Sequence, residues 1–288
     1  MEFPKNFLWG TAASAYQIEG RDPNDGKGDH IWNIYEREPG HIYENQTGDI
    51  ACDHIHRFKE DVAIMKKMGL KAYRFSMDWS RLLPEGTGRV NETGVKFYSD
   101  LIDELLANGV EPFITMYHWE LPYELYKKGG WLNRDIAEWF GEYAKLIAER
   151  FSDRVKYFFT LNEPQCFVGL GYLRGEHAPG IKAMLRDTFE MAHNALRAHG
   201  RAVQMLRAYA KQPIQVGFAP TCGMQSQQIL NFLLHLDTLC QTRQQSRHLR
   251  IAKYFHQQFG IYSLRYQAPM VFITDTDLWF ATLGGKYP

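Results

Sequence analysis

Short apolar runs recur along the chain with a spacing that fits alternating strands and helices. Five runs are too short for a typical helix and rich in aromatic or β-branched residues, at 7–13, 71–76, 111–117, 156–161 and 214–219. They predict five β-strands. Because they read as apolar throughout, we expect both faces of each strand to be buried, as in a barrel or a sheet covered by helices.

Helical periodicity fills the segments between these runs. Apolar residues spaced three and four apart lead from Ile55 to Met68 and end at a glycine, which suits the C-terminus of a helix. Similar patterns cover residues 98–105, 136–151 and 182–210. Strands and helices therefore alternate, which predicts an α/β fold built on a parallel sheet.

Side chains capable of chemistry gather just after the predicted strands. The four sets are Gln17 with Glu19, residues 76–79, residues 118–120 and residues 162–164. The carboxyl ends of successive strands form the active face of a (β/α)8 barrel, and such a barrel displays its polar residues there. No glycine-rich phosphate fingerprint follows any of the runs. The pattern favours a TIM-barrel type of fold.

Composition narrows the class of ligand. The chain has 33 basic and 33 acidic residues, so no strong charge field points to nucleic acid or to an anionic membrane as a partner. Aromatic residues make up 14% of the chain, but basic residues are not interleaved with them as in a single-strand-binding platform. A small neutral ligand fits this balance, and we expect neither a nucleic-acid partner nor a membrane partner.

The cysteines and the N-terminal residues bear on the cellular location. The four cysteines, at 52, 166, 222 and 240, are scattered, and none forms a CxxC pair. The opening MEFPKNFLWGTAA lacks the pattern of a signal peptide, and no run of about eighteen apolar residues occurs. We expect reduced thiols, a cytoplasmic location and no cofactor.

One cluster of metal-ligand types occurs early in the chain. Cys52, His54 and His56 lie two residues apart, so the predicted helix that starts there would direct them to different faces. Structural or solvated roles fit them better than a metal site. We therefore expect no metal.

A carbohydrate site would use the residues at the strand ends well. Such a site needs flat aromatic faces for sugar C–H groups, amide or imidazole groups for hydroxyls, and a carboxylic acid for the leaving oxygen. These requirements are met by Trp119, Gln17, His118, Asn162 and Glu163. Each of them alone has an ordinary structural explanation, but four strand ends with this chemistry point to function. The proline that follows Glu163 predicts an extended backbone there, which would fix where the carboxylate points.

Several long motifs carry a family resemblance. The segments FLWGTAASAYQIEG, YRFSMDWSR, TMYHWELP, TLNEP and GFAPT closely resemble, in order and spacing, the first half of glycoside hydrolase family 1, the β-glucosidase group. The resemblance runs from about residue 3 to residue 224. It implies a (β/α)8 barrel and the retaining hydrolysis of β-glycosides such as β-D-glucosides.

The same resemblance assigns roles to single residues. Glu163 matches the general acid/base of the family's Asn-Glu-Pro motif, and Arg74 matches the arginine close to the nucleophile. The residues that match the family's glycone contacts are Gln17, His118, Trp119 and Asn162. At the position after His118, the tryptophan of this chain resembles the residue found in the branch of the family that takes unphosphorylated sugars.

The resemblance weakens after residue 224. Residues 225–288 hold nine glutamines and no glutamate, whereas the preceding 224 residues hold six glutamines. We therefore divide the chain into a barrel part, 1–224, and an atypical tail, 225–288, and expect the barrel to be truncated after about the fifth strand. LWFATLGGKYP at 278–288 faintly resembles the family segment before the sixth strand.

The family's Thr-Glu-Asn-Gly nucleophile motif does not occur in the sequence. Asp275 and Asp277 follow a strand-like run, but they lie out of register with that motif and are poor substitutes. Two alternatives to an active enzyme stay open: a catalytically inactive derivative or sugar-binding remnant, and self-association that completes the barrel.

Overall fold

The computed structural model describes residues 7–220 and the strand backbones at 269–273 and 278–282. Residues 9–220 belong to one compact unit. Asp275, Asp277 and most of the expected tail, 225–288, lie outside the described residues. No helix in the described part is long and apolar enough to cross a membrane.

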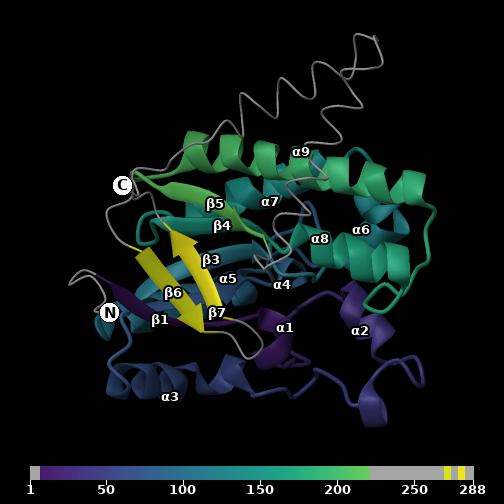
Figure 1. Ribbon diagram of the computed structural model, residues 1–288. Helices are drawn as coiled ribbons and strands as arrows, with labels where there is room; N and C mark the ends of the chain where they lie inside the picture. The colour runs from purple at the N-terminus through teal and green to yellow at the C-terminus, as the bar shows by residue number, and fades with distance from the viewer. Residues whose placement is uncertain (1–6, 221–268, 274–277, 283–288) are drawn as a thin grey trace. The chain divides into compact units, whose positions relative to one another are not determined.

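Five strands lie where the apolar runs predict them (Figure 1). They are β1 (Leu8–Ala13), β2 (Ala72–Ser76), β3 (Glu111–Tyr117), β4 (Tyr157–Asn162) and β5 (Gln215–Ala219). Each pairs in parallel with the next along the chain. This order confirms the predicted α/β fold, and it requires a crossover connection between every pair of neighbours.

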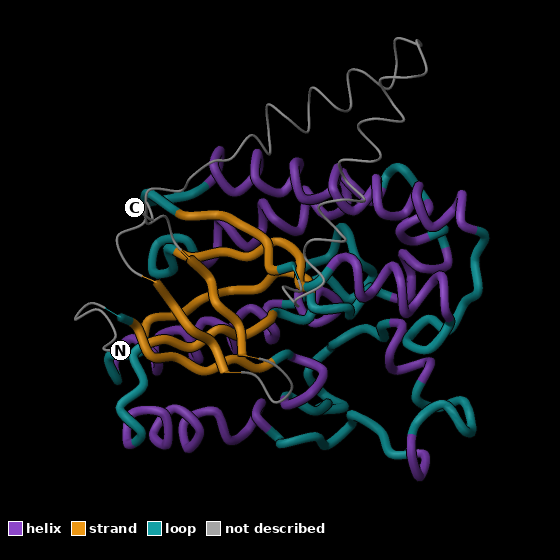
Figure 2. Tube along the Cα trace, in the orientation of Figure 1, coloured by secondary structure: helices purple, strands orange, loops and turns teal. Residues whose placement is uncertain are grey.

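Long helices supply those connections (Figure 2). They are α3 (His54–Lys67), α5 (Glu92–Ala107), α7 (Ile136–Phe151) and α9 (Leu185–Tyr209). Three of them, α3, α7 and α9, begin and end within about one turn of the helical patterns predicted from the sequence. The fourth, α5, begins earlier than the first apolar residue of its pattern. The helices α7 and α9 pack against each other beside β4 and β5.

Short elements shape the carboxyl ends of the strands. The helices are α1 (Ala15–Ile18), α2 (Ile31–Tyr35), α4 (Trp79–Leu82), α6 (Tyr123–Lys127), α8 (Pro164–Cys166), the 3₁₀ turns η1 (Tyr43–Asn45) and η2 (Gly130–Leu132), and the π-helix η3 (Phe167–Arg174). Two further strands, β6 (Pro269–Ile273) and β7 (Leu278–Thr282), occur in the tail. Four of these helices, α1, α4, α6 and α8, directly follow or closely follow β1 to β4, so they frame the face where the candidate residues lie.

The core explains why these elements hold their places. The apolar stripe of α7 includes Phe140, Tyr143, Ile147 and Phe151, all of them fully buried. Burial of one such side chain stabilises a fold by about 1.5–3 kcal/mol. Every residue of β2 is buried, as the unbroken apolar runs predicted, whereas β1 and β5 are mostly only half-buried and differ from that prediction. The sheet is thus a rigid base for side chains at its carboxyl edge.

Candidate active site

The candidate residues come from neighbouring strands and meet at one edge of the sheet. Arg74 lies within β2, His118 and Trp119 directly follow β3, and Asn162 is the last residue of β4, with Glu163 next. The strand pairing sets Arg74 beside Phe113 of β3. Parallel pairing therefore brings together residues that lie up to about ninety positions apart in the sequence.

Asn162 is the centre of the hydrogen-bond network. Its side chain is buried, its Oδ1 accepts from Arg74 Nη2 at 2.6 Å, and its Nδ2 lies 3.1 Å from His118 Nε2. A guanidinium can only donate, so it requires the amide oxygen on its own side and leaves the NH₂ group to donate to the imidazole. The network thereby fixes the orientation of the amide.

This orientation also fixes the state of His118. Since Nε2 accepts a hydrogen bond, the imidazole is neutral and carries its proton on Nδ1. Burial, with a further contribution from the charge of Arg74, lowers the pKa of His118 to about 3. The ring therefore stays neutral over the physiological pH range and retains one N–H group, on Nδ1.

Arg74 supplies a fixed positive charge below the site. It is buried, its Nε donates to Thr115 Oγ1 at 2.8 Å, and its guanidinium lies 4.9 Å from the centre of the Phe159 ring. Burial lowers the pKa of Arg74 to about 10, and the charge of Glu163 opposes that fall. Arg74 therefore stays protonated at neutral pH and attracts the Glu163 carboxylate.

The backbone of Glu163 differs from the sequence prediction. The extended conformation expected before Pro164 is wrong, because Glu163 has φ 46° and ψ 61°, in the left-handed region. Its N–H still pairs with β5 through Ala219 O at 2.7 Å, whereas its carbonyl already accepts from Cys166 N at 2.8 Å in α8. The chain must leave the strand and enter a helix within one residue. Since the proline disfavours the right-handed region, the left-handed one is used.

The pairing of β4 and β5 is irregular at the same place. Their register shifts between Phe159 and Asn162. Bulges of this kind bend a strand and redirect the next side chain. Glu163, which is half-buried, therefore leaves the strand at a local irregularity rather than continuing its alternation.

Trp119 is the second residue of the site with a left-handed backbone, at φ 86°. Its half-buried indole donates from Nε1 to the main-chain carbonyl of Asn162 at 3.0 Å. Its ring centre lies 5.5 Å from that of His177, which in turn lies 5.6 Å from Trp32. Half-buried aromatic faces thus border the polar network, an arrangement suited to sugar C–H groups.

Gln17 lies on α1, after β1, and is exposed. Its Oε1 accepts from Ser14 Oγ at 2.8 Å. No hydrogen bond within residues 7–220 joins it to Asn162. Hydrogen bonds thus join four of the six predicted site residues, Arg74, His118, Trp119 and Asn162, and Glu163 follows Asn162 directly in the chain. Gln17 lies in α1, which contacts β2 where Ala15 N donates to Ser76 Oγ.

Sequence reasoning missed the importance of Glu120. It is 1% exposed and lies directly after Trp119, yet its Oε1 accepts from Tyr16 N in α1 at 3.1 Å. A buried carboxyl needs such a partner. The signal available in the sequence was only its place in the third polar set, which does not reveal the contact with α1.

A buried ionic cluster lies close to Glu120 and was also unpredicted. Lys27 Nζ lies 2.5 Å from Asp78 Oδ2, and Arg81 Nε donates to Glu19 at 2.9 Å. Burial opposes both charges, but the ion pairs hold the pKa of Asp78 low and that of Arg81 high. The cluster joins the segment after β1 to α4 after β2.

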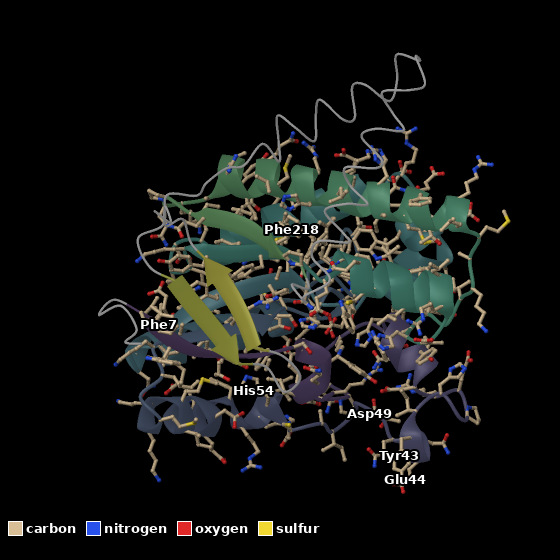
Figure 3. The ribbon with its side chains drawn as sticks, viewed as in Figure 1. Phe7, Tyr43, Glu44, Asp49, His54 and Phe218 are labelled. Atoms are coloured by element: carbon tan, nitrogen blue, oxygen red, sulfur yellow. The ribbon has the colours of Figure 1, made fainter. Side chains whose placement is uncertain are left out.

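The three residues considered for a metal site make separate contacts. His54, at the start of α3 (Figure 3), has Nδ1 2.6 Å from Asp61 Oδ2, and His56 has Nδ1 2.6 Å from Asp53 Oδ1. Cys52 is exposed outside the helix. Within the described residues no three side chains gather as metal ligands.

Known proteins resemble the chain over most of its length. Beta-glucosidase A of Thermotoga maritima is 52% identical over 210 residues, which cover 73% of this chain and 47% of the relative. The 1,4-beta-D-glucan glucohydrolase of Thermotoga neapolitana is 51% identical over 210 residues, which cover 73% of this chain and 49% of the relative. The chain spans about half the length of the curated relatives it matches.

A solved structure matches in the same way. The beta-glucosidase from Thermotoga maritima in complex with glucoimidazole has a TM-score of 0.75 and 50% identity, over 77% of this chain and 50% of that one. Such neighbours are (β/α)8 barrels, so the five parallel strands are consistent with part of a TIM-type barrel.

The family described as Glycosyl hydrolase family 1 matches residues 1–275, which reaches beyond the residue 224 at which the motif resemblance ends. This match confirms the family inferred from the motifs. The chain belongs to glycosyl hydrolase family 1.

Proposed function

We propose that the chain carries the acid/base half of a retaining β-glycosidase site that acts on small β-glycosides, with β-D-glucosides as the first candidates. One observation carries the proposal. Glu163 lies half-buried after β4, next to an asparagine whose amide is held between a buried arginine and a neutral imidazole. A proton donor beside fixed hydroxyl-binding groups is the arrangement that glycosidic cleavage requires.

The proposed roles follow from the contacts. Glu163 protonates the glycosidic oxygen as the bond breaks and later removes a proton from the attacking water. Asn162 and His118 hold sugar hydroxyls, because the network leaves them few other orientations. Trp119 contacts the sugar face, Gln17 binds from the β1 side, and Arg74 keeps the acid/base region positively biased.

The retaining mechanism also needs a nucleophile. A second carboxylate must lie about 5–5.5 Å from the first to form the glycosyl-enzyme. The sequence contains no recognisable match to the family's nucleophile motif, and Asp275 and Asp277 lie outside the described residues. Sugar binding without turnover is the second candidate function, and its support is the network of Arg74, Asn162 and His118, which presents hydroxyl-binding groups independently of a nucleophile.

Self-association is the partner relationship that we propose. Among the strands that the structure describes, β5 lies at the end of the pairing order, and its residues are only half-buried. An edge strand has main-chain groups ready to pair with another chain. A cytoplasmic location is proposed on the scattered cysteines alone, of which Cys52 and Cys166 are free thiols.

The test is hydrolysis of p-nitrophenyl β-D-glucoside by the 288-residue chain, with the oligomeric state measured on the same sample. Glu163→Gln should lower the rate by about 10²–10⁴-fold, as expected for loss of a general acid/base. The matched control is Glu149→Gln, at an exposed position of α7, which should leave the rate unchanged.

The outcomes separate the two candidates. Turnover that the Glu163→Gln change removes supports the enzyme and requires a second carboxylate from the tail or from another copy. A folded chain without turnover, which binds glucoimidazole in a calorimetric titration, supports the sugar-binding alternative. A chain that neither turns over the glucoside nor binds glucoimidazole contradicts both.

A further inference from the structure

Glu120 connects two parts of the candidate site that are distant in sequence. It follows Trp119 in the loop after β3, and its side chain is 1% exposed. Its Oε1 accepts a hydrogen bond from the N–H of Tyr16, the residue before Gln17, at 3.1 Å. Its other oxygen, Oε2, has no hydrogen-bond partner within residues 7–220. One oxygen of a buried acid is therefore committed to α1.

The helix that receives this contact, α1, is not stable by itself. α1 has four residues, and the side chain of its N-cap residue, Ser14, makes no capping hydrogen bond. A single helical turn is unstable by itself, and its first amides lack partners within the helix. Those amides find partners on other elements, Ala15 N on Ser76 Oγ at 2.7 Å and Tyr16 N on Glu120.

The surroundings of Glu120 define its chemical state. Burial raises the pKa of Glu120 well above its usual range, and the negative charge of Asp78 raises it further, with a smaller contribution from Glu19. Burial therefore favours the protonated form of the acid, and the oxygen that faces the Tyr16 amide acts as a hydrogen-bond acceptor. The side-chain amide of glutamine has the same shape and an equivalent acceptor oxygen, so glutamine at position 120 should accept the same hydrogen bond from Tyr16.

We propose that Glu120 is a positioning residue that holds α1, and with it the Gln17 amide, in a fixed place relative to His118 and Trp119. This inference rests on the proposed function, because it assigns Gln17 and Trp119 to opposite sides of one sugar site. The contact replaces the missing N-cap of α1 by an acceptor from the loop that also carries the two other residues. Loss of the acceptor leaves the Tyr16 amide buried without a partner.

Two variants of nearly equal size separate the hydrogen bond from packing. Glu120→Gln keeps the acceptor, whereas Glu120→Met keeps the length and apolar bulk without it. Amide hydrogen exchange measured on residues 14–19 should be about tenfold faster in the Met variant and unchanged in the Gln variant, as expected for loss of one buried hydrogen bond. Exchange within α7 should stay at the wild-type rate in both.

Affinity for glucoimidazole, measured by calorimetry on the 288-residue chain, gives the second readout. The Met variant should bind about tenfold more weakly and the Gln variant like the wild type, because misplacing one contact group costs affinity. A general loss of structure would accelerate exchange everywhere, so rescue by glutamine and the restriction to 14–19 distinguish positioning from stability.

Each outcome decides a specific point. Equal exchange in the Met and Gln variants, or faster exchange with unchanged glucoimidazole affinity, overturns the inference. If the Met variant does not fold, Glu120→Asp replaces it, since the shorter acid withdraws the oxygen from Tyr16 and should accelerate exchange in the same segment. A wild-type chain that does not bind glucoimidazole contradicts the proposed function, while the exchange rates still test whether Glu120 holds α1.

Discussion

The indole Nε1 of Trp119 donates to the main-chain carbonyl of Asn162 at 3.0 Å, which ties the loop after β3 to the last residue of β4. The bond joins Trp119, whose backbone is left-handed at φ 86°, to the residue directly before Glu163, whose backbone is left-handed at φ 46°. Such conformations are costly for residues with a Cβ and persist when surrounding contacts hold them. The hydrogen bond is therefore one of the contacts that keep Glu163 in place.

Removal of this hydrogen bond should loosen the site measurably. Trp119→Phe keeps an aromatic ring but leaves the Asn162 carbonyl without its indole donor, so the free energy of unfolding should fall by about 1–2 kcal/mol. Urea denaturation measures it. Trp139→Phe is the control, since Trp139 is also half-buried and its indole makes no hydrogen bond in the described part. Equal losses in the two variants would show that ring size, not the bond, matters.

The backbone of Glu163 predicts an unusual order of stability. Because Glu163 has φ 46°, the free energy of unfolding of the Glu163→Gly variant should exceed that of the Glu163→Ala variant by about 1 kcal/mol. Glycine lacks the Cβ that disfavours this backbone region. Denaturation of Glu163→Gly and Glu163→Ala tests this order, and neither variant should hydrolyse a glucoside. At Glu149, within α7, the order should be reversed by a similar amount. The same order at both positions would contradict a left-handed Glu163.

The sequence was sufficient for the framework of the fold because the framework depends on local pattern. The apolar run at 156–161 became β4 (Tyr157–Asn162), and the pattern at 136–151 became α7 with the same bounds. Parallel pairing follows from strand and helix alternation, so it was also predictable that Asn162 would approach residues after β3. The chemistry at the strand ends could then be placed without coordinates.

The details of the site depend on contacts that no local pattern encodes. Pro164 excludes one backbone region for Glu163, but the choice between the two that remain is made by the pairing with Ala219 and the start of α8. The contact of Glu120 with Tyr16 spans 104 residues. From the sequence, a charged residue such as Arg81 is expected to lie on the surface, and only the fold shows that it is paired with Glu19.

Arg74 should be sensitive even to replacement by lysine. Its guanidinium uses two nitrogens, one for Thr115 and one for Asn162, whereas an ammonium has no planar fork with which to bridge them. Arg74→Lys should lower the free energy of unfolding by about 1–3 kcal/mol, and Arg74→Met by about 3–5 kcal/mol, since the Met variant removes the charge that faces Glu163. Thermal and urea unfolding measure both, and a Met variant as stable as the Lys variant would refute a structural role for the charge.

His30 gives the chain a specific response to acid. It is fully buried at the N-terminus of α2, where its Nδ1 accepts from Asn33 N at 3.3 Å and its Nε2 faces Asp78 Oδ2 at 3.4 Å. Burial lowers the pKa of His30 to about 3, although the charge of Asp78 opposes the fall. In the unfolded chain the pKa is about 6.5. Between these values the unfolded state binds a proton that the native state does not.

The free energy of unfolding should therefore fall as the pH decreases from 6.5 toward 3. The contribution of His30 to this slope should approach about 1.4 kcal/mol for each pH unit. Above about pH 6.5, His30 should not affect the pH dependence of stability. His30→Asn keeps a good N-cap residue and removes the titration, so its stability should fall less steeply over pH 6.5 to 4.5, even though the smaller side chain lowers stability overall. Urea denaturation across this range measures the slope. His56→Asn is the control: the hydrogen bond that His56 donates to Asp53 raises the pKa of His56, so its contribution to stability changes only above about pH 6.5 and the variant should keep the wild-type slope over pH 6.5 to 4.5. A His30→Asn slope equal to that of the wild type would show that His30 takes up its proton in the native state.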